Sequence, residues 1–398
     1  MVKHFNKPFT QQEPIPEAAI NRVSEILRTG RLHRYNTLSD EASEASLLED
    51  EFADWQGANY CLATTSGGQS MQIALRAAGV KPGTKVLANA YTLAPVPGAI
   101  FATGGEPVFV EIDDNWHTDI NDLREKAEKS DAKFFMLSHM RGHIADMDRI
   151  VEICKEFDIT LIEDCAHTMG AKWKGKRSGN FGDIACFSTQ TYKHLNSGEG
   201  GFLTTNNPEI AARAVIGSGS YMLYGSHGAI PPEEVFQKFQ LESPNCSARL
   251  DNLRAAILRI QLPLLEESIR RWNSRYSTLE SGFASILGLK VVKRRQHEEF
   301  VGSSIQFQVP GIDIDNISTF LSRCATRGVE IKWFGGREPT AFTSRYDSWQ
   351  YLGKIDPLPN TIRVLSTTCD MRVPLTFSKQ DCLDIVDIVA EEVNRISL

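Results

Sequence analysis

The 398-residue sequence lacks the features of a membrane, secreted or nucleic-acid-binding protein. No apolar run approaches the roughly 20 residues that a membrane-spanning helix needs, and residues 1–20 hold no apolar stretch of a secretory signal. Acidic residues outnumber basic ones by 50 to 43, giving a net charge of −7, and no basic stripe is present. We therefore expect a cytoplasmic protein with neither a membrane nor a nucleic-acid partner.

Paired cysteines are also missing. The eight cysteines occur singly, without a C-x-x-C motif, and several fall in apolar runs. This pattern indicates reduced, partly buried thiols, and it gives no reason to expect a zinc or other metal site. The cysteines are Cys61, Cys154, Cys165, Cys186, Cys246, Cys324, Cys369 and Cys382.

The chain is too long for one ordinary core, so we expect one large and one smaller domain. Between residues 60 and 205, short apolar runs alternate with helical stretches. This alternation predicts an α/β fold, with a mostly parallel sheet covered by helices on both faces. The predicted strands include 85–90, 106–112, 132–139, 159–165, 183–188 and 200–205.

The pattern changes after residue 246. Residues 247–286 are helical in pattern, with a kink or break expected at Pro263, and a strand, a helix, a strand and a last helix follow. We assign residues 1–246 to a large α/β domain with an N-terminal helical segment. Residues 247–398 are assigned to long helices and a small C-terminal α+β domain.

Three features follow predicted strands, at the sheet edge where ligands of parallel sheets bind. Residues 66–69 (SGGQ) open a helix, and free N–H groups at a helix start suit a phosphate. Asp164 ends a buried strand, which is uncommon for an unpaired carboxylate. Ser188 and Lys193 stand between an apolar run and the glycines of residues 198–201.

A phosphate cradle, a buried carboxylate and a lysine together indicate pyridoxal 5′-phosphate as cofactor. The lysine condenses with the cofactor aldehyde, and the carboxylate keeps the pyridine nitrogen protonated so that the ring accepts electrons. The lysine, once released as a free amine, moves a proton between the two reacting carbons.

Segments 64–79, 139–150, 161–207 and 249–262 resemble the DegT/DnrJ/EryC1/StrS aminotransferases of fold type I. The resemblance extends from about residue 13 to the C-terminus. It implies a pyridoxal-phosphate-dependent transferase in which Lys193 forms the Schiff base, Asp164 contacts the pyridine nitrogen and His167 lies beside the ring. It also implies a homodimer whose active sites are completed by the neighbouring subunit.

The sequence departs from this family at several positions. Leu93 stands where an aromatic residue often stacks on the cofactor, so either Tyr91 or Leu93 is expected to pack on the ring. Asn245 and Ser247 are alternative candidates for the residue that reaches the neighbour's phosphate. Arg141 replaces a common Tyr or Phe, and EIKWFGGREP (330–339) replaces a His-Tyr-Pro segment. The expected cofactor contacts are Gly67, Gly68, Gln69, Tyr91, Leu93, Asp164, His167, Ser188, Lys193 and Asn245.

Other charged residues have two interpretations. The segment 30–36 with its basic residues is either a solvated turn or a contact for an anionic substrate, and the segment 332–337 is either a pocket floor or ordinary surface. Glu199 is expected to hold a turn. Glu163 and Asp164 should not act as a pair, because adjacent strand residues point to opposite faces. The basic and aromatic candidates are Arg31, His33, Arg34, Lys332, Trp333 and Arg337.

The sequence thus predicts an aminotransferase that works in two half-reactions. The amino group of L-glutamate or L-glutamine passes to the cofactor, and then to a keto or aldehyde group of a sugar, which is expected to be nucleotide-linked, or of a cyclitol, with ping-pong kinetics. The alternatives are a dehydratase or lyase on the same scaffold, and a regulatory homologue without turnover. Family sugar dehydratases replace the lysine with histidine, so Lys193 favours transamination.

Overall fold

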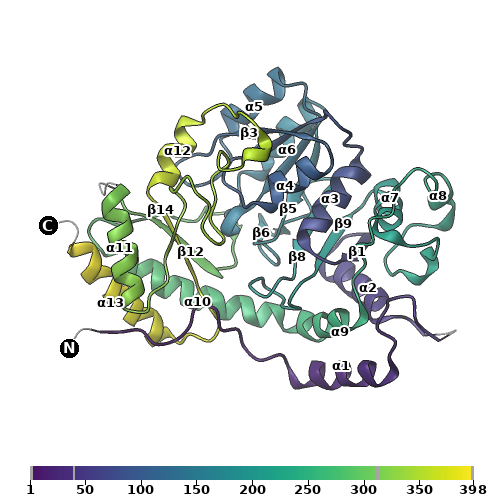
Figure 1. Ribbon diagram of the computed structural model, residues 1–398, viewed down its shortest axis with the longest axis horizontal. Helices are drawn as coiled ribbons and strands as arrows, with labels where there is room; N and C mark the ends of the chain where they lie inside the picture. The colour runs from purple at the N-terminus through teal and green to yellow at the C-terminus, as the bar shows by residue number, and fades with distance from the viewer. Residues whose placement is uncertain (1–2, 39–40, 311–313, 396–398) are drawn as a thin grey trace.

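A computed structural model describes residues 3–38, 41–310 and 314–395, and a seven-stranded sheet is its largest part. Helices surround this sheet (Figure 1), whose strand order is β1-β9-β8-β5-β4-β2-β3. Five neighbouring strands, from β3 to β8, run parallel, while β9 runs antiparallel to β8 and β1. The strands are β1 (Tyr60–Thr64), β2 (Lys85–Asn89), β3 (Glu106–Val110), β4 (Phe134–Ser138), β5 (Thr160–Asp164), β8 (Ile184–Ser188) and β9 (Gly201–Thr205). The prediction of a mostly parallel sheet is confirmed.

Helices cover both faces of this sheet, as the continuous apolar strands predicted. In β4, Phe135 and Leu137 face one core, while Phe134 and Met136 face the other. Side chains alternate across a strand, so one five-residue strand contributes to both cores. The first core also contains side chains of four helices, α2 (Glu44–Gln56), α5 (Ile120–Lys129), α6 (Met147–Glu156) and α9 (Asn252–Gln261). The second core contains side chains of three helices, α3 (Gly67–Ala78), α4 (Pro95–Ala102) and α7 (Pro208–Gly219).

A second, four-stranded antiparallel sheet lies in the C-terminal part, with the order β10-β12-β14-β13. Its core is aromatic and aliphatic, with Phe283, Phe307 and Phe320 fully buried. The sequence missed β14 and α12. The elements are β10 (Lys290–Val291), β12 (Ser304–Gln308), β13 (Lys332–Trp333), β14 (Thr368–Arg372), α10 (Leu265–Ala284), α11 (Ile314–Thr326), α12 (Pro359–Ser366) and α13 (Lys379–Asn394).

The expected break at Pro263 is observed. Helix α9 ends at Gln261, a 3-10 turn covers Leu262–Leu264, and α10 starts at Leu265. Proline at this position lacks the N–H that a continuous helix would use. Among the residues that the structure describes, no helix is both long and apolar enough to cross a membrane.

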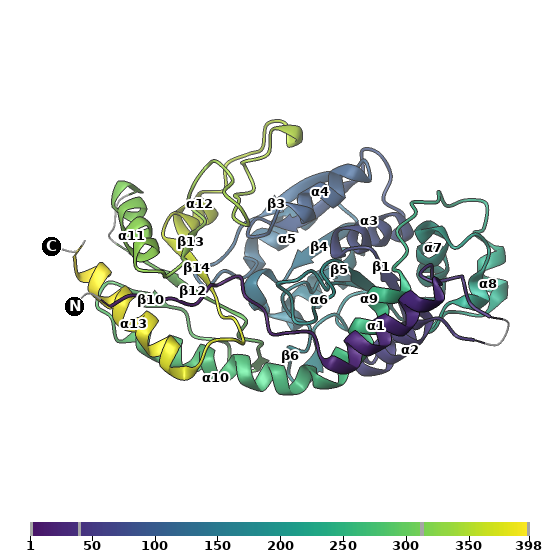
Figure 2. The same cartoon turned by 60° about the horizontal axis from the view of Figure 1, so that its bottom comes forward.

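The N-terminal segment packs with the C-terminal core. Phe5 and Phe9 are buried there, and the ring centroids of Phe5 and Phe377 lie 5.0 Å apart. Figures 1 and 2 show the N-terminal segment beside α13. We keep the division at residue 246 as a proposal, with the amendment that residues 5–9 belong with the C-terminal part.

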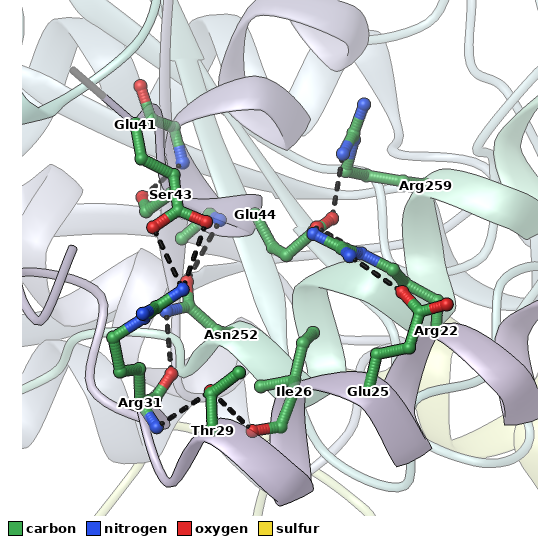
Figure 3. Close-up of polar contacts among 12 residues, drawn as sticks. Arg22, Glu25, Ile26, Thr29, Arg31, Glu41, Ser43, Glu44, Asn252 and Arg259 are labelled. Carbon is green, nitrogen blue, oxygen red and sulfur yellow. Dashed lines mark hydrogen bonds and ion pairs between the residues drawn. The ribbon is translucent and has the colours of Figure 1, made fainter. Parts of the chain in front are cut away.

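Charged residues join the first helix, α1 (Glu17–Thr29), to α2 and α9. Glu44 is buried between two arginines (Figure 3), with Arg22 Nε at 2.7 Å from Oε1 and Arg259 NH1 at 2.7 Å from Oε2. Arg31 lies nearby and pairs with Glu41 at 3.1 Å. Arg31 is therefore neutralised by its own chain.

Arg34 fits neither interpretation of the segment 30–36, because it is completely buried and paired. Two of its nitrogens donate to the two carboxylate oxygens of Glu49, both at 2.8 Å. Glu49 also accepts from the backbone N–H groups of Ala63 and Gly228. The prediction of a solvated or substrate-binding arginine is wrong here, since a carboxylate fifteen residues away, on α2, partners it.

Glu49→Gln should lower the free energy of unfolding by about 3–5 kcal/mol, because it leaves the buried Arg34 unpaired. Burial opposes ionisation of Glu49, but Arg34 outweighs it and lowers its pKa to about 2. The ion pair therefore stabilises the fold fully above the ordinary carboxyl range, and its contribution is lost as the pH falls toward 2. Denaturant unfolding at several pH values measures both effects.

Glu51→Gln is the matched control on the same helix, because Glu51 is partly exposed where it pairs with Arg259. Its cost should stay at about 0–1 kcal/mol. Equal costs for the two variants would contradict the buried-pair interpretation.

Candidate active site

A cavity of about 380 Å³ opens at the carboxyl ends of the parallel strands. Ser138, Asp164 and Ser188, the last residues of β4, β5 and β8, all line it. Gly67 at the start of α3 and Arg372 at the end of β14 complete its two sides. The ligand position expected for a parallel sheet is thus bounded by the seven-stranded and the four-stranded sheet.

Lys193 and His167 meet in this cavity. The Nζ atom of Lys193 lies 2.8 Å from Nε2 of His167. Burial lowers the pKa of Lys193 to about 7, with a further contribution from Arg141. Burial, and then the Lys193 charge, also hold the pKa of His167 well below its usual range. At neutral pH Lys193 therefore exists partly as a free amine, the nucleophilic form, beside a neutral imidazole.

Asp164 lies on the same cavity wall with its carboxylate fixed. Oδ2 accepts from Ser138 Oγ at 2.8 Å, and Oδ1 accepts from the Ala166 N–H at 3.1 Å. Asn89 in turn fixes Ser138, because its amide group bonds both the N–H and the C=O of that residue. Two neutral donors leave Asp164 able to accept another N–H. Ser138 was not anticipated from the sequence.

Glu163 points to the opposite face of the sheet from Asp164. It accepts from His139 Nε2 at 2.9 Å and from the N–H groups of Gly179, Phe181 and Gly182 at 2.7–2.9 Å. The expectation that the two carboxylates do not act as a pair is thus supported by their separate partners. Glu163, His139 and Cys165 lie close together and are residue types that can bind a metal ion. The Glu163 carboxylate, however, already accepts hydrogen bonds at both oxygens.

The start of α3 approaches β8 very closely. A Cβ on Gly67 would lie 2.8 Å from Cβ of Ser188, so only glycine fits at this position. Gly67, Gly68 and Ser188 line the cavity. Gln69 does not line it, and its N–H already donates to the capping Ser66 Oγ at 3.1 Å. Gln69 is thus a poorer phosphate donor than expected.

Leu93 and Tyr91, the two alternatives for packing on the ring, occupy different places. Leu93 lines the cavity, whereas Tyr91 lies completely buried outside the lining, 5.1 Å from the Phe334 ring. Asn245 is exposed and outside the cavity, and its Oδ1 accepts from the N–H of Ser247. The choice between Asn245 and Ser247 for a contact with a neighbouring subunit stays open.

The segment 332–337 does not supply the cavity floor. Lys332, Trp333 and Arg337 are absent from the lining, Arg337 is exposed, and the Trp333 indole donates to Ser366 O at 2.8 Å. Glu199, expected to hold a turn, does line the cavity.

Residues after β13 contribute aromatic cavity surface instead. Phe342 and Trp349 line the cavity, and Figure 2 shows this connection extending from the C-terminal sheet toward α4. There Tyr351 contacts Phe101 of α4, with ring centroids 5.0 Å apart. The sequence analysis missed these residues, although the aromatic content of 342–351 was a usable signal.

The sequence pattern of the DegT/DnrJ/EryC1/StrS aminotransferase family matches residues 14–390. The chain belongs to this family. It is 33% identical over 247 residues to the dTDP-3-amino-3,4,6-trideoxy-alpha-D-glucose transaminase of Streptomyces venezuelae, covering 61% of each chain. It is 32% identical to the UDP-2-acetamido-2-deoxy-3-oxo-D-glucuronate aminotransferase of Pseudomonas aeruginosa, covering 65% of this chain and 67% of that one.

Solved structures share the fold over nearly the whole chain. A 3-amino-5-hydroxybenzoic acid synthase structure superposes with a TM-score of 0.83 at 24% identity, covering 99% of this chain and 100% of that one. The S. venezuelae DesV structure gives 0.80 at 25% identity, covering 95% and 94%. In sequence, the chain spans only 33–61% of the length of the first three curated relatives it matches.

In the cofactor-free protein, Lys193 should react with an acetylating reagent with a pH midpoint near 7. Arg141→Gln should raise this midpoint, because Arg141 lowers the pKa of Lys193, and Asp164→Asn should lower it, because Asp164 raises that pKa. Mass spectrometry of the Lys193 peptide measures the labelled fraction at each pH.

The denatured protein serves as the control, and its midpoint should return to the ordinary lysine range, about 10.4. A midpoint in that range for the folded protein, or shifts of the same sign in the two variants, would show that burial and these charges do not set the basicity of the amine.

Proposed function

We propose that this protein is a pyridoxal-phosphate-dependent aminotransferase that moves an amino group from L-glutamate or L-glutamine to a keto or aldehyde group of a sugar or cyclitol. The observation that carries the proposal is the buried Lys193 amine, held 2.8 Å from His167 in a cavity with Asp164. Family membership and the relatives named as aminotransferases of nucleotide-linked sugars support it.

The residues of the cavity fit this cofactor in size and chemistry. Gly67 approaches Ser188 so closely that only glycine fits there. The N–H groups at the start of α3 and the Ser188 hydroxyl are therefore available in the cavity to bind a phosphate. Asp164 has a carboxylate oriented by Ser138 and free to accept from a pyridinium N–H. Leu93 offers an apolar contact for the ring. Pyridoxal phosphate, when bound, supplies an aldehyde and an electron-accepting ring.

Lys193 has two tasks in the proposed reaction. Its free-amine form would condense with the aldehyde of bound pyridoxal phosphate and release water, and once an amino acid has taken its place there, the free Nζ would accept and return the proton that moves between the two carbons. His167 Nε2 lies within hydrogen-bond distance of Nζ, at 2.8 Å, and holds the amine in place. The second substrate then enters the same cavity, so ping-pong kinetics follow.

The proposal also includes a cytoplasmic location and a homodimer in which the neighbouring subunit completes each active site. Asn245 and Ser247 are exposed on one subunit and outside its own cavity, where they are available to a neighbouring subunit. A homodimer therefore agrees with their position.

A regulatory role without turnover is the second candidate. It is favoured by one relative, the pleiotropic regulatory protein of Geobacillus stearothermophilus, which is 31% identical over 267 residues. Loss of catalysis would allow the reactive groups to change, whereas Lys193, His167 and Asp164 all line the cavity. The presence of Lys193 also argues against a dehydratase, because sugar dehydratases of the family have a histidine in place of this lysine.

The purified protein with pyridoxal phosphate should show a visible absorption band of the lysine-bound cofactor. L-glutamate or L-glutamine should move this band to the ultraviolet, and a suitable keto sugar should restore it. Lys193→Ala should lack the band, while Lys81→Ala, a change at an exposed lysine, should keep it.

A band that ignores both amino acids would remove the proposed donors and favour the lyase alternative. Absence of any band after cofactor addition would favour the regulatory alternative.

A further inference from the structure

Arg141 is a buried arginine in the cavity wall whose guanidinium is incompletely partnered. Only 8% of its surface is exposed, its Nε has no hydrogen-bond partner among the described residues, and its Nη2 lies 3.0 Å from a single carboxylate oxygen, that of Asp370. Its backbone has a φ of 53°, in the left-handed region that non-glycine residues rarely adopt. Such strain concentrates at functional sites. A buried donor without an acceptor is costly, so this guanidinium is suited to bind a ligand acceptor.

A chain of buried polar groups orients Arg141. His143 Nε2 lies 2.7 Å from Gln306 Oε1, and Gln306 Nε2 donates to Asp370 Oδ1 at 2.7 Å. The other carboxylate oxygen of Asp370, Oδ2, lies 3.0 Å from Arg141 NH2, in an ion pair. Because the amide of Gln306 donates to Asp370, its oxygen must accept from His143. The direction of every bond is thus fixed, and Asp370 presents Oδ2 to the arginine.

Arg372 brings a second positive charge to the same cavity. Its guanidinium stacks 3.6 Å from the ring centroid of Tyr192, and no carboxylate of the described chain lies within ion-pair distance of it. Arg141 lies near enough to lower the pKa of Arg372, after burial. Lys332 on β13 is the register partner of Asp370 on β14, and Arg372 is two residues from Asp370 on the same strand. Arg141, Arg372 and Lys332 thus lie near one carboxylate.

We infer that the sugar or cyclitol unit of the amino acceptor itself carries an acidic group, a carboxylate or a phosphate, and that Arg141 and Arg372, which line the same cavity as Lys193, bind it. This inference rests on the proposed transamination. The donor amino acid has a carboxylate and can neutralise the arginines in the first half-reaction. The acceptor occupies the same cavity in the second half-reaction, when a neutral compound would leave these two partly buried, like-charged groups without a negative charge from the ligand. Planar guanidinium groups bind carboxylate and phosphate oxygens in pairs.

The test uses the holoenzyme loaded with pyridoxamine phosphate, the amine form that meets the acceptor, and three sugars that differ only at carbon 6: D-glucuronate, D-glucose 6-phosphate and D-glucose. Isothermal titration calorimetry should show that at least one acidic sugar binds more than about tenfold more tightly than D-glucose, the range of a charge-assisted contact. The acidic sugar that binds more tightly identifies carboxylate or phosphate as the preferred group. Arg372→Gln and Arg141→Gln should each reduce this discrimination to about threefold or less.

Arg337→Gln is the control, because Arg337 is exposed and lies outside the cavity lining. Its discrimination should match that of the wild type. Equal affinities for the three sugars, including no detectable binding of any of them, would overturn the inference, as would full discrimination in both cavity variants. The visible cofactor band, recorded on each variant loaded with pyridoxal phosphate instead, tests the proposed transamination separately and reports whether the variant is folded.

Discussion

The chemistry of the site depends on a lysine that the fold keeps only partly protonated. A buried ammonium ion loses its hydration, and the fold adds cationic neighbours rather than a direct carboxylate partner for Lys193. Asp164 favours the charged form but is held by Ser138 and the Ala166 N–H. The same cavity holds the close approach of α3 to β8 at Gly67 and Ser188, and His167 lies 2.8 Å from the amine.

Much of the large sheet could be predicted because its strands are buried on both faces. Apolar side chains must then follow one another without interruption, and the resulting runs end within two residues of the observed strands. The same logic located Lys193 and Asp164, because polar groups immediately after such runs fall at one edge of the sheet. The role of His167 came from the family resemblance, whose pattern places a histidine three residues after the aspartate.

The C-terminal part resisted prediction where its polar residues have distant partners. Strand β14 contains the buried Asp370, which resembles a turn residue in the sequence. Its partners, Gln306 and Arg141, come from other parts of the chain. The prediction for Arg34 was wrong for the same reason, because its partner Glu49 lies fifteen residues away on α2. Local sequence shows the charge of such residues but not the neighbour that neutralises it.

The packing of Phe5 and Phe9 in the C-terminal core has a consequence for biosynthesis. Lys3 and Asp387, which form an ion pair in this region, are 384 positions apart. Domains usually fold from the N-terminal end as the ribosome releases them. Here Phe5 and Phe9 leave the ribosome long before Phe377 and the other C-terminal residues that bury them. Until that part of the chain has been made, these two aromatic side chains lack their core, and chaperones have an apolar target in this segment.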